Sequence, residues 1–311
     1  MRLKAFWPER QKPQKGRDPI EGNKTAVITG STGGIGSAIA DQLAATERHL
    51  VLVNRNGVRA AEQKTALQAA HPGANVDLIQ ADLMDIEEIK EAARTVLERH
   101  PQIDALFNNS GVLTSERVMS AQGHESNYAV NTLAPYVMMQ SLRPALRRDG
   151  TSERSMIINT TSSAQNAAKS LDTDSLSDPQ VIGGLTGAYA TTKLALTTLG
   201  TAMAEELNGE GIMVRSVCPG AVVTPMTKTS DAMPAILKLL VPLLFNKPEK
   251  QATKMIHAAQ PESFGARTGI YITNGKEKPL PKLSLDRNTQ EQLMAKLAHD
   301  ADEKELEVPR S

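Results

Sequence analysis

The sequence has little of two residue classes that many functions require. It contains one cysteine, Cys218, and aromatic residues make up 3% of its 311 residues. One thiol cannot form an intramolecular disulfide or a thiolate zinc site, and it is typical of a protein from a reducing compartment. The shortage of aromatic rings argues against a platform that stacks nucleic-acid bases.

Net charge and long apolar runs are missing as well. The 35 basic and 35 acidic residues cancel, so no overall field attracts nucleic acid or anionic lipid. No apolar run reaches the roughly 20 residues that span a bilayer. The nearest, residues 234–245, contains Lys238 and Pro242, and we interpret it as a buried lid helix, with an interfacial anchor as the alternative. We expect a cytoplasmic protein with at most peripheral membrane contact.

The apolar share of 40% is enough for a sizeable core. Along the chain, the spacing of the apolar residues alternates between strand and helix patterns. Nearly continuous apolar runs predict buried strands at residues 25–29, 50–54, 76–80, 104–108, 156–160, 213–217 and 269–272. Helical patterns lie between them, for example at 37–45, 60–70, 86–99 and 191–207. This alternation predicts an α/β fold: one doubly wound domain with a parallel sheet of about seven strands and helices on both faces.

The chain divides into three parts. Residues 1–22 form a basic, proline-containing N-terminal arm, 23–275 form the domain, and 276–311 form a C-terminal extension with a short amphipathic helix around Leu293 and Leu297. Segments 164–187 and 225–266 interrupt the alternation after strand ends. Because ligands of doubly wound sheets bind beyond these ends, both segments are predicted pocket walls, the second one a lid.

A glycine-rich turn, Thr29–Gly36, joins the first strand to the first helix. Glycines let a backbone approach a pyrophosphate closely, and a helix N-terminus offers free N–H groups to it. Their spacing, Gly30-x3-Gly34-x-Gly36, differs from the Gly-x-Gly-x-x-Gly dinucleotide fingerprint, and an ordinary tight turn is the alternative. The second strand then ends in Asn54-Arg55 without an acidic residue. Arg55 favours the 2′-phosphate of NADP(H) over NAD(H), unless it is only a solvated loop residue.

Tyr189 and Lys193 are four residues apart in a helical pattern, so they share one helix face. A nearby cation lowers the pKa of a phenol, which could then exchange a proton near neutral pH. Ser162 follows the fifth strand, where its hydroxyl could orient a carbonyl or an alcohol. Taken singly, each has an ordinary explanation: a core tyrosine beside a surface lysine, and turn chemistry by serine.

Together, these motifs resemble those of the short-chain dehydrogenase/reductase family, in the family's order, over residues 23–273. The resemblance also rests on Asp82-Leu83, Asn108-Asn109-Ser110-Gly111, Asn131 and Pro219–Thr224. The gap between Ser162 and Tyr189, Arg55 and the apolar insert after Thr224 resemble the retinol-dehydrogenase-like branch, whose members often act on bulky, lipophilic alcohols and carbonyls. With the turn and Arg55, the resemblance implies that the cofactor contacts Gly30, Ser31, Thr32, Gly34, Ile35, Gly36, Asn54, Arg55, Asp82, Leu83, Asn109, Ser110, Gly111, Tyr189, Lys193, Pro219, Gly220, Val222 and Thr224.

The resemblance implies a Rossmann-type, NADP(H)-dependent alcohol dehydrogenase or carbonyl reductase. Tyr189 would be the general acid/base, Ser162 would bind the reacting oxygen, Lys193 would lower the pKa of Tyr189 and hold the ribose, and Asn131 would hold a relay water. No metal is expected, because the histidines show no ligand spacing. The alternative is a catalytically silent NADP(H)-sensing or membrane-surface binding protein on the same fold. Homodimers or homotetramers are usual for the family.

Overall fold

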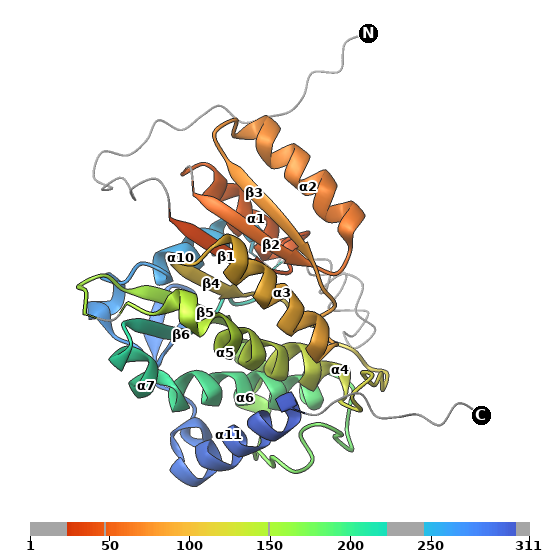
Figure 1. Cartoon of the computed structure of the whole chain (residues 1–311). Coiled ribbons are helices and arrows are strands. Elements are labelled where there is room, and N and C mark those ends of the chain that lie inside the picture. The colour runs from red at the N-terminus through yellow and green to blue at the C-terminus, as the bar shows by residue number, and fades with distance from the viewer. Residues whose placement is uncertain (1–23, 47, 149, 223–245, 303–311) are drawn as a thin grey trace.

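The computed structural model describes residues 24–46, 48–148, 150–222 and 246–302. Eight strands form one sheet in the order β3-β2-β1-β4-β5-β6-β7-β8 (Figure 1). The strands are β1 Thr25–Thr29, β2 His49–Asn54, β3 Asn75–Gln80, β4 Ala105–Asn108, β5 Ser155–Thr160, β6 Ile212–Cys218, β7 Ile270–Thr273 and β8 Lys276–Lys278. All pairs are parallel except β7 with β8. The predicted single α/β domain with helices around a parallel sheet is confirmed, with one additional strand.

Helices connect the strands and cover both faces of the sheet. They are α1 Gly34–Ala44, α2 Gly57–Ala70, α3 Ile86–Arg99, α4 Ser126–Tyr128, α5 Ala134–Leu146, α6 Ala188–Ala202, α7 Ala204–Gly209, α10 Pro248–Ala258 and α11 Arg287–Asp302. Short helical turns are η1 Ala129–Leu133, η2 Ser163–Ala167, η3 Ser263–Ala266 and η4 Lys282–Leu285. The predicted helix at 191–207 is two helices, α6 and α7, which meet at Met203.

Two hydrophobic clusters lie on the two faces of the sheet. One is covered by α3, α5, α6 and α11, and the other by α1, α2 and α10. In Figure 1, α3 and α5 cross the front of the sheet, while α1 and α10 lie behind it. β1 is buried along its whole length, as expected for a central strand of a parallel sheet. The burial on both faces explains why the predicted strands read as continuous apolar runs.

The C-terminal extension is part of this core. Leu293 and Leu297 of α11 are fully buried, which fits the predicted amphipathic pattern. The buried Asp300 accepts a hydrogen bond from the Tyr128 hydroxyl at 2.7 Å. Helix α11 also packs on α6. The extension therefore supports the helix that carries Tyr189 and Lys193.

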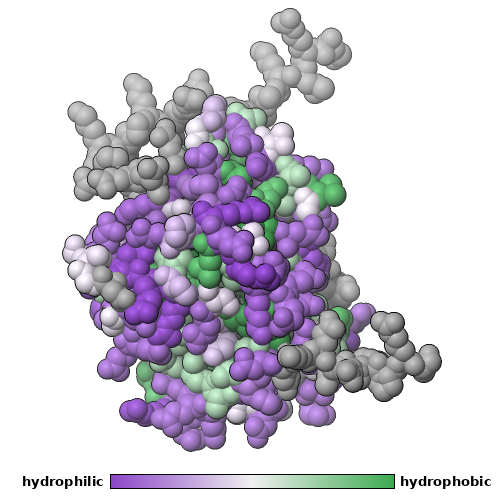
Figure 2. Space-filling view, viewed as in Figure 1, coloured by the Kyte–Doolittle hydropathy of each residue, from purple (hydrophilic) through white to green (hydrophobic). Residues whose placement is uncertain are grey.

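The surface on the side of α2, α3 and α5 is mainly hydrophilic. Figure 2 shows hydrophobic residues there only in small separate groups. Among the described residues, no helix has the length and apolar content needed to cross a bilayer. The predicted arm 1–22, the apolar run 234–245 and the tail after residue 302 lie outside the described part.

Candidate active site

The glycine turn is held tightly against the loop that follows β4. The Asn109 Nδ2 donates hydrogen bonds to the carbonyl oxygens of Thr29 and Gly30, at 3.2 and 3.0 Å. A Cβ on Gly36 would lie 2.4 Å from that Nδ2 and 2.3 Å from the Gly30 oxygen. Gly30 also has a φ of +66°, which favours glycine. The glycines are needed because turn and loop approach too closely for side chains. Ser110 joins this contact by donating its N–H to Thr29 Oγ1 at 3.1 Å.

Helix α1 starts without the side-chain cap that the next two helices have. Its N-cap residue is Gly33, and its first turn contains no acidic residue. By contrast, Asn56 caps α2 and Asp85 caps α3. The first N–H groups of a helix have no partners within it, and they lie at the positive end of the helix dipole. The start of α1 therefore fits an anionic pyrophosphate, with the N–H groups of 34–36 as donors.

The end of β2 is fixed to the same turn. Asn54 accepts a hydrogen bond from the Ser31 N–H and donates one to Ser31 Oγ, both at 2.8 Å. Gln63 of α2 binds Ser31 from the other side, accepting from its Oγ at 2.9 Å and donating to its carbonyl at 2.7 Å. Gln63 was not a sequence candidate, because a lone glutamine in a helix carries no motif signal. Thr32 and Ile35 lie in the same turn, and Ile35 is buried.

Arg55 follows Asn54 and points into solvent. Its side chain is 73% exposed, and its Nη1 lies 3.9 Å from the Asp82 carboxylate. Asp82 is fixed at the end of β3, where its N–H donates to Glu88 at 2.7 Å and its Oδ1 accepts from Met84 N–H at 3.0 Å. The adjacent Leu83 is buried in the core. The loosely held guanidinium of Arg55 can reach a phosphate near the end of β2.

Tyr189, Lys193 and Ser162 meet beside the end of β5. Tyr189 and Lys193 are both buried and lie one turn apart near the start of α6. The Ser162 side chain lies near enough to Tyr189 to act on the pKa of its phenol. The Lys193 Nζ donates to the Thr160 carbonyl at 2.9 Å and lies 5.9 Å from the centre of the Tyr189 ring. The structure thus brings these three candidates together.

Burial dominates the proton affinities of this group. It raises the pKa of Tyr189 above that of a free phenol, although the nearby Ser162 side chain acts in the other direction. Burial thus shifts the pKa of Tyr189 in the direction opposite to the predicted lowering by Lys193, and that role of Lys193 stays a prediction. Burial also lowers the pKa of Lys193 to about 8. At neutral pH, Tyr189 is a neutral phenol and most Lys193 side chains are still charged.

Asn131 lies in the π-helical turn Ala129–Leu133, between α4 and α5. Its Oδ1 accepts from the Val112 N–H at 2.9 Å, and its Nδ2 donates to the Val112 carbonyl at 3.0 Å. The same Nδ2 lies 3.3 Å from the hydroxyl of Thr192, next to Lys193. Such π turns are frequent at functional sites. Asn131 thus connects the loop after β4, which also contains Gly111, to α6, and its water-holding role stays a prediction.

The segment after β6 runs past the same edge of the sheet. Gly220 has a φ of +79°, and a Cβ there would lie 2.5 Å from the Asn274 side chain. Val222 forms a parallel bridge with Asn246. Pro219, before Gly220, follows the buried end of β6. The remaining candidate of this motif, Thr224, lies outside the described residues.

The two predicted pocket walls differ in placement. Residues 164–187 lie beside the loop after β4, where the Glu125 N–H donates to the Ser177 carbonyl at 2.7 Å. Of the segment 225–266, the described part includes α10, which packs on α1 on the far face of the sheet. Gln42 of α1 donates to the Glu249 carbonyl there at 2.8 Å. Residues 246–266 therefore support α1, and the predicted lid lies outside the described residues.

Unpartnered polar atoms mark the end of β5. Within the described part of the chain, the buried hydroxyls of Thr160 and Thr161 have no hydrogen-bond partner. Buried polar groups normally find partners, so this edge suits a ligand with polar groups. With the bare start of α1, it fits a dinucleotide whose phosphates lie at the turn and whose other end reaches Tyr189.

A parallel sheet that carries such a turn and a Tyr-Lys-Ser group at one edge is characteristic of dinucleotide-dependent oxidoreductases. The family model described as short chain dehydrogenase matches residues 24–173 and 175–235. The chain therefore belongs to the short-chain dehydrogenase/reductase family, whose members use nicotinamide cofactors.

Individual relatives agree with this assignment. Human polyprenol dehydrogenase is 27% identical over 281 residues, which cover 89% of this chain and 85% of that protein. Human retinol dehydrogenase 13 is 27% identical over 269 residues, covering 83% and 79%. The solved structure of a mutant short-chain dehydrogenase/reductase from Serratia marcescens is 27% identical, with a TM-score of 0.65, and covers 83% of this chain and 99% of that one.

Proposed function

We propose that the protein is an NADP(H)-dependent alcohol dehydrogenase or carbonyl reductase that acts on lipophilic substrates. The observation that carries the proposal is the meeting of Tyr189, Ser162 and Lys193 beside the end of β5. NADP(H), when bound, supplies or accepts the hydride. The start of α1 would bind its pyrophosphate, and Lys193 would bind the nicotinamide ribose through the N–H groups that do not contact Thr160.

In the reductive direction, Tyr189 Oη donates a proton to the substrate oxygen while that oxygen gains negative charge. Ser162 hydrogen-bonds the same oxygen and fixes its position. The raised pKa of Tyr189 supports this direction, because a neutral phenol is the form that donates a proton. The phenolate left behind is reprotonated from solvent, and Asn131 would hold the relay water beside Lys193.

Arg55 supports NADP(H) as the cofactor. It is the first residue after β2, its guanidinium is exposed, and no acidic residue ends that strand. A guanidinium binds a phosphate by bidentate hydrogen bonds, whereas NAD(H) needs an acceptor for its ribose hydroxyl. The lipophilic substrate class is supported by the names of two relatives, which refer to polyprenol and retinol, both apolar alcohols.

The mechanism is tested by Tyr189→Phe, which removes one hydroxyl and keeps the ring. We expect turnover of a lipophilic carbonyl to fall about 10²–10⁴-fold, because general acid catalysis is lost. NADPH binding should persist. Tyr136→Phe is the matched control, since Tyr136 is also buried but lies in α5. Turnover within twofold of wild type in a folded Tyr189→Phe protein would refute this role.

A further inference from the structure

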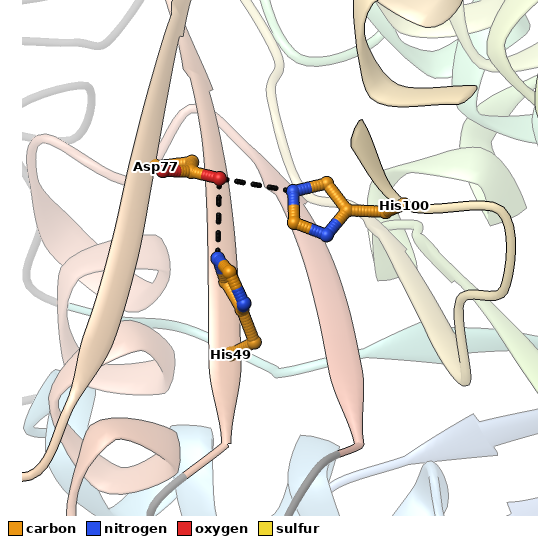
Figure 3. A group of neighbouring side chains, drawn as sticks. All are labelled: His49, Asp77 and His100. Atoms are coloured by element: carbon orange, nitrogen blue, oxygen red, sulfur yellow. Dashed lines mark hydrogen bonds and ion pairs between the residues drawn. The ribbon is translucent and has the colours of Figure 1, made fainter. Parts of the chain in front are cut away.

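Three side chains from three elements lie close together near the amino-terminal ends of β2 and β3. Asp77 of β3 faces both His49, the first residue of β2, and His100, which follows α3 (Figure 3). The His49 Nε2 is 3.2 Å from Asp77 Oδ2, and the His100 Nε2 is 3.0 Å from the same oxygen. The possible ligand atoms of all three residues lie within 4.8 Å of one another.

The strand register produces this convergence. Asp77 pairs with Val51, so it lies on the same face of the sheet as Val51 and as His49 two residues earlier. His100 ends α3, with its N–H bonded to the Val96 carbonyl, and its ring packs edge-on against His49 at 4.5 Å between ring centres. The group is remote from the reaction site, because β2 separates His49 from Asn54 by roughly 16 Å of extended chain.

The spacing suits a tetrahedral metal site. Bonds of 2.0–2.1 Å to zinc place neighbouring ligand atoms about 3.3 Å apart. The two nitrogen–oxygen distances, 3.2 and 3.0 Å, are close to that edge length, and the ligand atoms of the two histidines lie within 4.8 Å of each other. The side chain of His100 is 7% exposed, while those of His49 and Asp77 are 31% and 33% exposed, so one side stays open to water as a fourth ligand.

We propose that His49, Asp77 and His100 bind one Zn²⁺ ion, which ties the starts of β2 and β3 to the end of α3. Two imidazoles and one carboxylate form a ligand set that proteins use for zinc and neighbouring first-row metals. In the metal-free protein both Nε2 atoms face an acceptor oxygen and carry the ring protons. On binding, each neutral ring exchanges with water to the tautomer that carries its proton on Nδ1, which leaves the Nε2 lone pair for the metal.

The test is calorimetric titration of the metal-free protein with ZnCl₂, followed by Co²⁺ as a spectroscopic probe. We expect one ion per chain, and visible absorption bands of tetrahedral Co²⁺ that Zn²⁺ removes. His49→Gln, which removes one partly exposed ligand, should weaken Zn²⁺ binding at least tenfold. Its matched control is His71→Gln, because His71 forms a histidine–carboxylate pair with Asp41 at 2.9 Å and belongs to no three-ligand group of the described residues.

A second variant keeps the proposal testable if His49→Gln folds poorly. Asp77→Asn preserves the shape and one acceptor oxygen but removes the negative ligand, and it should weaken Zn²⁺ binding to a similar extent. Circular dichroism of each variant verifies folding before titration. The proposal is overturned if wild type does not bind Zn²⁺, if His49→Gln and Asp77→Asn bind it as wild type does, or if His71→Gln is weakened as strongly as they are.

Discussion

Lys193 and Arg215 are both buried cations, but they differ in how many of their N–H groups are hydrogen-bonded. All five N–H groups of Arg215 donate to main-chain carbonyls of residues 258–267, at 2.8–2.9 Å. The Lys193 ammonium has three N–H groups and donates one hydrogen bond within the described part of the chain, to Thr160. Burial lowers the pKa of Arg215 to about 10, so this cation is also costly to bury, but its five hydrogen bonds offset that cost. A partly bonded cation is costly to bury, which is expected where a site is built for a ligand.

The largest effect should follow from Arg215→Met. This change leaves five carbonyl oxygens without donors, those of Ala258 and Ser263 in buried hydrogen bonds, and each such loss costs about 1–3 kcal/mol where water cannot enter. We expect the free energy of unfolding to fall by at least about 3 kcal/mol, measured by urea denaturation. Arg215→Lys should recover only part of the lost stability, because an ammonium cannot reproduce the five planar donors of a guanidinium. An unchanged midpoint for Arg215→Met would show that these hydrogen bonds do not hold the fold.

Lys193→Met should act in the opposite direction on stability. A pKa lowered from 10.5 to about 8 corresponds to roughly 3 kcal/mol of unfavourable burial at neutral pH. Loss of the Thr160 hydrogen bond offsets about 1 kcal/mol of the gain. We expect the variant to be roughly 2 kcal/mol more stable in the same denaturation experiment, while turnover falls strongly. A less stable variant would mean that Lys193 is a structural cation like Arg215.

The stability of wild type and of Lys193→Met should depend differently on pH. Between about pH 8 and pH 10.5, unfolded Lys193 binds a proton that the folded residue has released. The unfolded state then binds more protons, so the stability of wild type should rise with pH across this window. Below about pH 8 the difference from Lys193→Met should be constant. Wild type and Lys193→Met with parallel stability curves from pH 7 to 10.5 would contradict the lowered pKa.

The sequence predicts most of the fold because parallel strands buried on both faces read as apolar runs. All seven predicted strands are present. β8 was missed because Lys276-Glu277-Lys278 has no apolar alternation, and it forms only by pairing with β7. The break between α6 and α7 was also not predicted, because Met203 itself is neither glycine nor proline.

The site residues follow from motifs, but their environments do not. The spacing of Tyr189 and Lys193 gives a shared helix face, yet it cannot show that both are buried, and burial decides the direction of the Tyr189 pKa. The group of His49, Asp77 and His100 cannot be predicted from the sequence either. Its members are 28 and 23 residues apart, and only the pairing of β2 with β3 brings them together.

The central claim, that this edge of the sheet holds NADP(H), is tested most directly by titrating the folded protein with NADPH and with NADH, followed by cofactor fluorescence. We expect saturable binding of both cofactors, with tighter binding of NADPH. Arg55→Asp should lose that preference, whereas Arg287→Asp, the same charge change at an exposed residue of α11, should keep it. Tighter NADH binding would contradict the role of Arg55, and a folded sample that binds neither cofactor would contradict the account as a whole.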